Sequence, residues 1–208
     1  MLPDLSEKDV DLGSLAQRAS EDPSFLSKLV AGLSDKQERA GYNCVRALLL
    51  LAEEKPLLLY PHWDILVGLL RSENTYFKLR GANLIAAIIS ADSENRFEDV
   101  FDHYYDLLDG QSVIVACYIA GNSGRIASAK PGLQSRITAR LLTIEDTHHP
   151  PQRRDLIKGH AIEAFGEYFE DSGDRSKILE FVRAQLESNS PRTRKKAREF
   201  LERWGDTG

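Results

Sequence analysis

LRGANLIAAII, from Leu79 to Ile89, is the stretch that decides the fold of this chain. In it, Gly81 is followed after three, four and seven residues by apolar side chains, at Leu84, Ile85 and Ile88. Side chains at this spacing share one face of an α-helix. An arginine stands directly before the glycine. The pattern predicts an amphipathic helix with a small residue where a neighbouring helix can approach closely.

The same arrangement recurs along the chain. Small residues stand near the start of every second expected helix, at Gly41, Gly81, Ala120, Gly159 and Ala197, which are 40, 39, 39 and 38 residues apart. In three of these places a basic residue comes directly before the small one, as Arg80, Lys158 and Lys196. A fixed period near 39 residues is typical of stacked helical repeats.

The remaining sequence also consists of helical stripes separated by turn residues. Apolar side chains recur at helical spacing over residues 24–33, 36–53, 62–71 and 76–90, and in further stripes up to Trp204. The two-residue alternation of half-buried strands is not sustained anywhere. The sequence therefore predicts an all-α protein.

These repeats resemble the HEAT/armadillo-type helical repeat superfamily, and HEAT more than armadillo repeats because each unit contains two expected helices. The resemblance covers about residues 22–204, although Ala40 and Ile119 stand where the family has a basic residue. It implies a right-handed α-α superhelix, a HEAT-like solenoid of about five helix pairs. We expect an N-terminal segment with a capping helix over residues 1–21 and one repeat domain over residues 22–208, with repeats at 22–55, 56–92, 93–130, 131–171 and 172–205.

Composition bounds the possible function. The chain of 208 residues has a net charge of −5 and 42% apolar residues, and its two cysteines, Cys44 and Cys117, are too few for a disulfide framework or a zinc site. No apolar run approaches the roughly 20 residues that span a bilayer, and the acidic N-terminus is unlike a signal peptide. We expect a reduced, soluble, cytoplasmic protein without membrane partners.

Catalytic motifs are missing from the sequence. The densest group of possible metal ligands, which includes His148 and His149, lies in a proline-flanked turn, and we interpret it as a loop between repeats. His160 and Glu163 are one helical turn apart, but no second pair completes a di-metal site. We therefore predict a protein that is not an enzyme and has no cofactor and no metal.

A polar row accompanies the repeated small residues. Asparagines stand two positions after three of them, and arginines stand five positions after two of them: Asn43, Asn83, Asn122, Arg46 and Arg125. At 100° per residue both offsets lie opposite the apolar face. In HEAT-like solenoids the second helices line the concave surface, so the resemblance implies that this row binds a protein partner, of unknown identity, through amide and guanidinium donors. Alternatively, the asparagines only tolerate a solvated face or bond between neighbouring helices.

The C-terminal half suggests a second possibility. Residues 1–110 carry 19 acidic and 11 basic side chains, whereas residues 152–208 carry 11 acidic and 12 basic ones. Five cations follow one another in the last helix, at Arg192, Arg194, Lys195, Lys196 and Arg198. They form either the solvated face of a terminal repeat or a nucleic-acid contact, as in HEAT-like DNA-binding or DNA-glycosylase-like proteins. A glycosylase pocket has only Trp63 with Asp64, or Trp204 with Asp206, as candidates.

Overall fold

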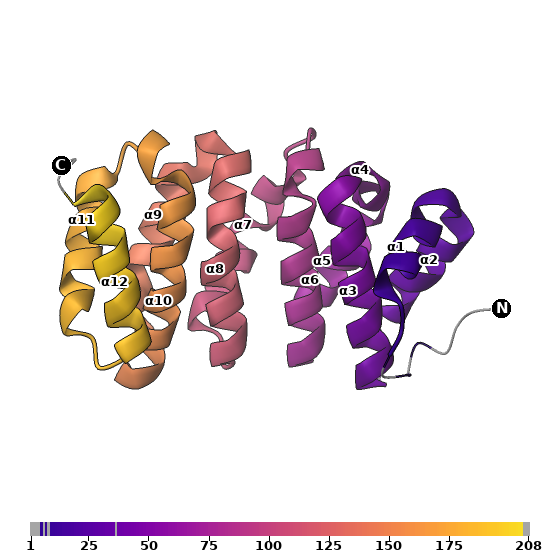
Figure 1. Cartoon of the computed structure of the whole chain (residues 1–208), viewed down its shortest axis with the longest axis horizontal. Helices are drawn as coiled ribbons and strands as arrows, with labels where there is room; N and C mark the ends of the chain where they lie inside the picture. The colour runs from indigo at the N-terminus through magenta and orange to yellow at the C-terminus, as the bar shows by residue number, and fades with distance from the viewer. Residues whose placement is uncertain (1–4, 6, 8, 36, 206–208) are drawn as a thin grey trace. The chain divides into compact units, whose positions relative to one another are not determined.

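The structure is a computed structural model that describes residues 5, 7, 9–35 and 37–205 (Figure 1). These residues form α-helices, single 3-10 turns and loops, and no strand occurs among them. The predicted all-α class is confirmed. The chain divides into two compact units, Met1–Val100 and Phe101–Gly208, which we call the N-terminal and the C-terminal unit and describe separately.

The N-terminal unit is built on three helices that follow one another in space, α1, α3 and α6, with α2 packed on α1 and α3, and α5 packed on α6. Its elements are α1 (Leu12–Glu21), α2 (Pro23–Gly32), α3 (Glu38–Glu54), α4 (Pro56–Leu59), η1 (Tyr60–His62), α5 (Trp63–Leu70), α6 (Thr75–Ala87) and η2 (Ile89–Ala91). The helices begin where the sequence provides caps. Asp22, for example, accepts hydrogen bonds from the backbone N–H groups of Ser24 and Phe25, at 2.9 and 3.0 Å, and Pro23 occupies the first helical position.

In the C-terminal unit α8, α10 and α12 pack side by side, and α9 contacts α8, α10 and α11 (Figure 1). α7 (Arg96–Asp106) starts in the N-terminal unit and ends in this one. The elements that follow are η3 (Leu107–Asp109), α8 (Val113–Ala129), η4 (Pro131–Leu133), α9 (Gln134–Leu142), η5 (Thr143–Asp146), α10 (Pro151–Tyr168), η6 (Phe169–Asp171), α11 (Arg175–Ala184), η7 (Gln185–Glu187) and α12 (Pro191–Trp204).

The sequence period reappears as a contact period in the C-terminal unit. Ser128 donates to the Glu167 carbonyl at 3.1 Å, 39 residues away. Thr193 Oγ1 donates to the Asp155 carbonyl at 2.7 Å, 38 residues away. The backbone N–H of His148 donates to Asp109 at 2.7 Å, again 39 residues away. Equivalent positions of consecutive repeats therefore lie next to each other.

The repeated small residues lie where chain segments approach closely. A Cβ on Gly159 would come within 2.7 Å of Thr193 Oγ1 on α12, and one on Gly41 would overlap the Arg80 guanidinium on α6. Gly81 differs, because its close contacts are backbone atoms of α5, at 2.7 and 2.8 Å. Its small size thus serves packing against the preceding helix. The two alanines at equivalent places, Ala120 and Ala197, are fully buried.

Candidate functional site

The basic residues that precede the small ones are tied into the interior. Arg80 is 5% exposed, and its guanidinium donates to the carbonyls of Leu33, at 2.6 Å, and Asp35, at 3.3 Å. These carbonyls belong to the turn between α2 and α3, so Arg80 fastens this turn to α6. A buried charge requires such hydrogen bonds. The Arg80 side chain therefore links α6 to this turn and is not accessible to a partner.

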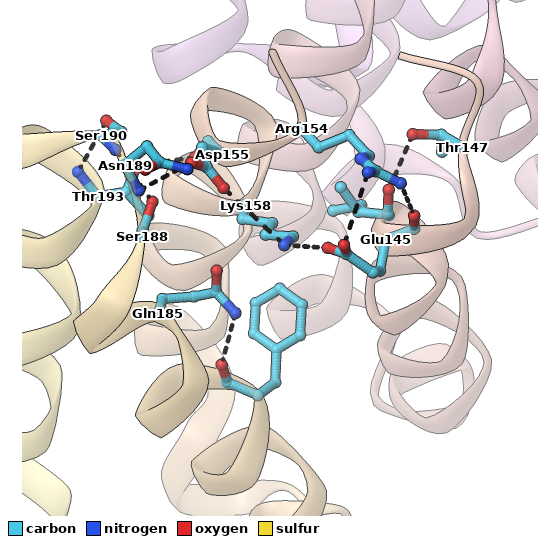
Figure 2. A network of polar contacts seen from close by, with 12 residues as sticks. Glu145, Thr147, Arg154, Asp155, Lys158, Gln185, Ser188, Asn189, Ser190 and Thr193 are labelled. Atoms are coloured by element: carbon cyan, nitrogen blue, oxygen red, sulfur yellow. Dashed lines mark hydrogen bonds and ion pairs between the residues drawn. The ribbon is translucent and has the colours of Figure 1, made fainter. Parts of the chain in front are cut away.

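Lys158 has the corresponding role in the C-terminal unit (Figure 2). It is 8% exposed, and its ammonium group bonds to the Glu145 carboxylate and lies 4.0 Å from Asp155. The hydrogen bond from Lys158 holds the pKa of Glu145 below its ordinary value. Asp155 in turn accepts from the backbone N–H of Asn189 at 3.0 Å, which joins α10 to the loop before α12.

An open pocket of about 580 Å³ lies beside this network and is lined by Lys158, Phe181 and Gln185 among others. The Gln185 side chain donates to the Phe181 carbonyl at 3.0 Å (Figure 2). Of the acidic groups that line the pocket, Glu145 is bonded to Lys158, and Asp155 accepts from the backbone N–H of Asn189. In the described part of the chain no group of three or more His, Cys, Asp or Glu side chains has the arrangement of a metal site.

The asparagine and arginine row separates into two sets. Asn43 is 5% exposed and donates to the backbone carbonyls of Leu5 and Glu7, at 2.9 and 3.1 Å. Asn122 is half-buried and shares a hydrogen bond with the buried phenol of Tyr104, whose pKa is raised by burial and lowered by that bond. Asn83 is half-buried as well. The asparagines thus lie deeper than the helical offsets predict.

The two arginines of the row, by contrast, lie on the exposed face. Arg46 is part of a stripe on α3 with Tyr42 and Leu50, which are 55% and 44% exposed, and its guanidinium lies 5.5 Å from the centre of the Tyr42 ring. Arg125 lies on α8 in a stripe that also contains Tyr118, which is 46% exposed. Helical spacing of four or seven residues explains both stripes.

The basic run of α12 is similarly divided. Arg192, Lys195 and Arg198 are exposed. Arg194, however, donates to the Ser188 carbonyl at 2.5 Å, and Lys196 donates to the Gly159 carbonyl at 3.0 Å and pairs with Glu163 at 2.8 Å. Two of the five cations therefore hold α12 to the loop before it and to α10.

Of the two candidate aromatic–acid pairs, the structure describes only Trp63 with Asp64 in full, and these two side chains face different ways. Trp63 is buried in the core, whereas Asp64 points outward and pairs with Arg96 at 2.5 Å. Trp204 packs on Phe169 and Phe200, and Asp206 lies outside the described residues. Of the histidines expected in a loop, His148 bonds to Asp109 at 2.6 Å and His149 to the Leu108 carbonyl at 3.1 Å.

A cluster of partly buried titratable groups, which sequence reasoning did not bring together, lies in the C-terminal unit. Burial raises the pKa of the Cys117 thiol, while the charges of Lys196 and Arg153 act against this rise. Burial lowers the pKa of His160, and the charges of Lys196 and Arg192 lower it further. These effects require that α8, α10 and α12 bring the groups close together. The 39-residue spacing between Arg153 and Arg192 was the available signal.

No described helix is both long and apolar enough to cross a membrane. The comparisons with known proteins identify no relative: no family model, no curated protein and no solved structure matches the chain.

Proposed function

We propose that the chain is a non-catalytic protein-binding module of the cytoplasm, whose helix pairs form a short right-handed HEAT-like solenoid and whose second helices present the binding face. The observation that carries the proposal is the placement of exposed apolar side chains. Nine large apolar residues are exposed in the described part of the chain, and six of them lie on second helices: Tyr42, Leu50, Tyr76, Ile114, Tyr118 and Leu156.

The composition of this face supports binding to protein. Tyr and Arg are enriched in protein–protein interfaces, because both combine a large contact area with hydrogen bonding. Each unit provides such a combination: Tyr42 with Arg46 on α3, and Tyr118 with Arg125 on α8. In addition, these side chains project from helices fixed by internal hydrogen bonds, which reduces the entropy lost on binding.

The sequence repeat is the observation that supports a solenoid. The small residues recur at nearly constant spacing from Gly41 to Ala197, and that range includes both units. Within the C-terminal unit, hydrogen bonds join residues one period apart, as from Thr193 to Asp155. Nearest-neighbour stacking of repeats requires contacts that recur at the sequence period, as these hydrogen bonds do.

The test uses the exposed arginines of the row. A tagged Arg46→Glu, Arg125→Glu variant and the wild type are used for affinity capture from a native lysate, followed by quantitative mass spectrometry. Lys28→Glu, Arg175→Glu is the matched control, because it reverses two exposed cations on α2 and α11. Asn43 and Asn122 stay unchanged, since their side chains have internal partners.

A partner that the wild type and the control retain, and that the Arg46/Arg125 variant loses, supports the proposal once purified partner reproduces the loss in a titration. Equal capture by all three proteins contradicts it, as does capture of no protein at all. Nucleic-acid binding is the second candidate, and it rests on the three exposed cations of α12, Arg192, Lys195 and Arg198. It predicts an affinity for generic duplex DNA that falls steeply with salt.

A further inference from the structure

The first turns of α8, α10 and α12 lie next to one another in the C-terminal unit. The N-terminal residues of α10 and α12 meet where Thr193 donates to the Asp155 carbonyl at 2.7 Å. Farther along, Lys196 donates to the Gly159 carbonyl at 3.0 Å. α8 is in register with α10 in the same way, because Ser128 at its end meets the Glu167 carbonyl at 3.1 Å. The three helices therefore run in the same direction.

This register places exposed side chains in rows across the three helices. Residues 39 positions apart form the first row, Ile114, Arg153 and Arg192, and the next one, Cys117, Leu156 and Lys195. Ile114 is 58% exposed and Leu156 is 37% exposed. Tyr118, at 46%, lies one turn after Ile114 on α8. Apolar side chains thus lie on α8 and on α10, and the cations Arg153, Arg192 and Lys195 lie on α10 and α12, where Lys195 pairs with Glu199 at 3.5 Å.

Electrostatics adds a positive potential to this surface. Lys196 and Arg153 act on the Cys117 thiol, and Lys196 and Arg192 act on His160, so the charges from two helices converge there. The N-terminal ends of α8, α10 and α12 contribute partial positive charge on the same side. The first turns of these three helices contain no acidic residue, and Asp155, which follows the first turn of α10, is 7% exposed and faces Asn189 and Lys158.

We infer that this surface, formed by Ile114, Tyr118, Arg153, Leu156, Arg192 and Lys195, docks an acidic segment of a partner protein in which apolar side chains adjoin carboxylates. The inference rests on the proposed function and specifies its partner. Carboxylates complement Arg153, Arg192 and Lys195, and apolar side chains cover Ile114 and Leu156.

A protein segment fits this surface better than a nucleic acid does. Ile114 and Leu156 give bases no stacking platform, and Tyr118 is a single exposed ring, whereas proteins that bind single strands stack successive bases on several aromatic side chains. The carboxylate of Glu163, which is 48% exposed, borders the surface and is paired with Lys196 at 2.8 Å. The apolar side chains of an amphipathic acidic peptide, in contrast, can cover Ile114 and Leu156.

The experiment measures fluorescence anisotropy with the full chain and a labelled synthetic peptide in which pairs of Leu or Phe alternate with pairs of Asp or Glu. The control peptide has Asn and Gln in place of the acids. We compare the wild type with Arg153→Glu, Arg192→Glu and with Ile114→Ser, Leu156→Ser. Arg175→Glu on α11 is the matched control, and circular dichroism verifies that each variant is folded.

We expect the acidic peptide to bind the wild type and the Arg175 control equally, and each double variant at least about tenfold more weakly, which corresponds to about 1.4 kcal/mol. Equal binding of the amide peptide, or unchanged affinity of either double variant, overturns the inference. So does tighter binding of an oligonucleotide. A wild type that dimerises through this surface, and becomes monomeric in Arg153→Glu, Arg192→Glu, also overturns it, since the occupant is then a second copy.

The same variants separate this inference from the proposed function. If the native partner is lost on changing Arg46 and Arg125 but not on changing Arg153 and Arg192, the module binds protein and the acidic-segment site is wrong. If no variant affects capture, the proposed function itself fails.

Discussion

We expect Gly→Ala to destabilise the protein at Gly81 and to stabilise it at Gly68, although the two glycines lie on adjacent helices. At Gly81 on α6 a Cβ would lie 2.7 Å from the Leu66 carbonyl oxygen and 2.8 Å from the backbone nitrogen of Leu70, both on α5. At Gly68 on α5 it would meet no atom within 4 Å. Both positions are inside helices of the N-terminal unit, so the same substitution compares packing alone.

The magnitudes follow from these contacts. In a helix interior, Gly→Ala contributes about 1 kcal/mol of stability, and Gly68→Ala should show most of it. Gly81→Ala has the same contribution but overpacks the α5–α6 contact, which costs about 3 kcal/mol because backbone atoms yield only when the two helices separate. The net result is a loss of about 2 kcal/mol, so the two variants should differ by about 3 kcal/mol in the free energy of unfolding.

The assay reports on the N-terminal unit alone. The chain has two tryptophans, Trp63 in this unit and Trp204 in the other. In a Trp204→Phe background, the fluorescence of buried Trp63 therefore follows unfolding of the N-terminal unit in urea. A Gly81→Ala protein as stable as its parent, or a shift of the same sign for both alanines, would refute the close approach of α5 and α6.

Three further results are expected. Arg80→Met should lower the free energy of unfolding by about 2 kcal/mol, because the carbonyl of Leu33 loses a charged donor; a change near zero in urea unfolding contradicts the buried tie. Burial lowers the pKa of His149 below its ordinary 6.5, so the unfolded chain binds more protons and stability falls as pH drops below 6.5. The fall between pH 7 and 5 should be smaller in His149→Gln, and equal slopes refute this. Burial raises the pKa of Cys44 to about 11, so Ellman's reagent should label half-buried Cys117 in the native protein and Cys44 only on unfolding; early labelling of a Cys117→Ser protein contradicts this.

Local periodicity was enough to predict the helices. The expected helix over residues 24–33 is Pro23–Gly32, and the one over residues 36–53 is Glu38–Glu54, because apolar spacing and caps act within a few residues. The close contacts at Gly41 and Gly159 were predictable too, since a small residue at a constant helical position has few other uses. These inferences need only information that the chain carries locally.

The depth of polar side chains was less predictable. The helical angle places Asn43 near exposed Arg46. The backbone carbonyls of Leu5 and Glu7, which are far from Asn43 in the sequence, nevertheless accept hydrogen bonds from its amide. No local pattern indicates such a cover. In the basic run of α12, by contrast, helical geometry alone could have separated the exposed cations from those that bond to neighbouring segments. Positions 192, 195 and 198 are three apart and share a face, whereas Lys196 faces α10.

The position before each small residue shows why cations in a helical repeat need not mark a binding surface. One residue corresponds to 100° around the helix, so this position lies on the flank next to the neighbouring chain. There Arg80, Lys158 and Lys196 reach backbone carbonyls or carboxylates and are withdrawn from solvent. Because these bonds hold neighbouring chain segments together, a binding surface has to come from positions whose side chains are not used in this way. Ile114 and Arg153, one period apart and both exposed, differ in charge and polarity, and the proposed partner site depends on that difference.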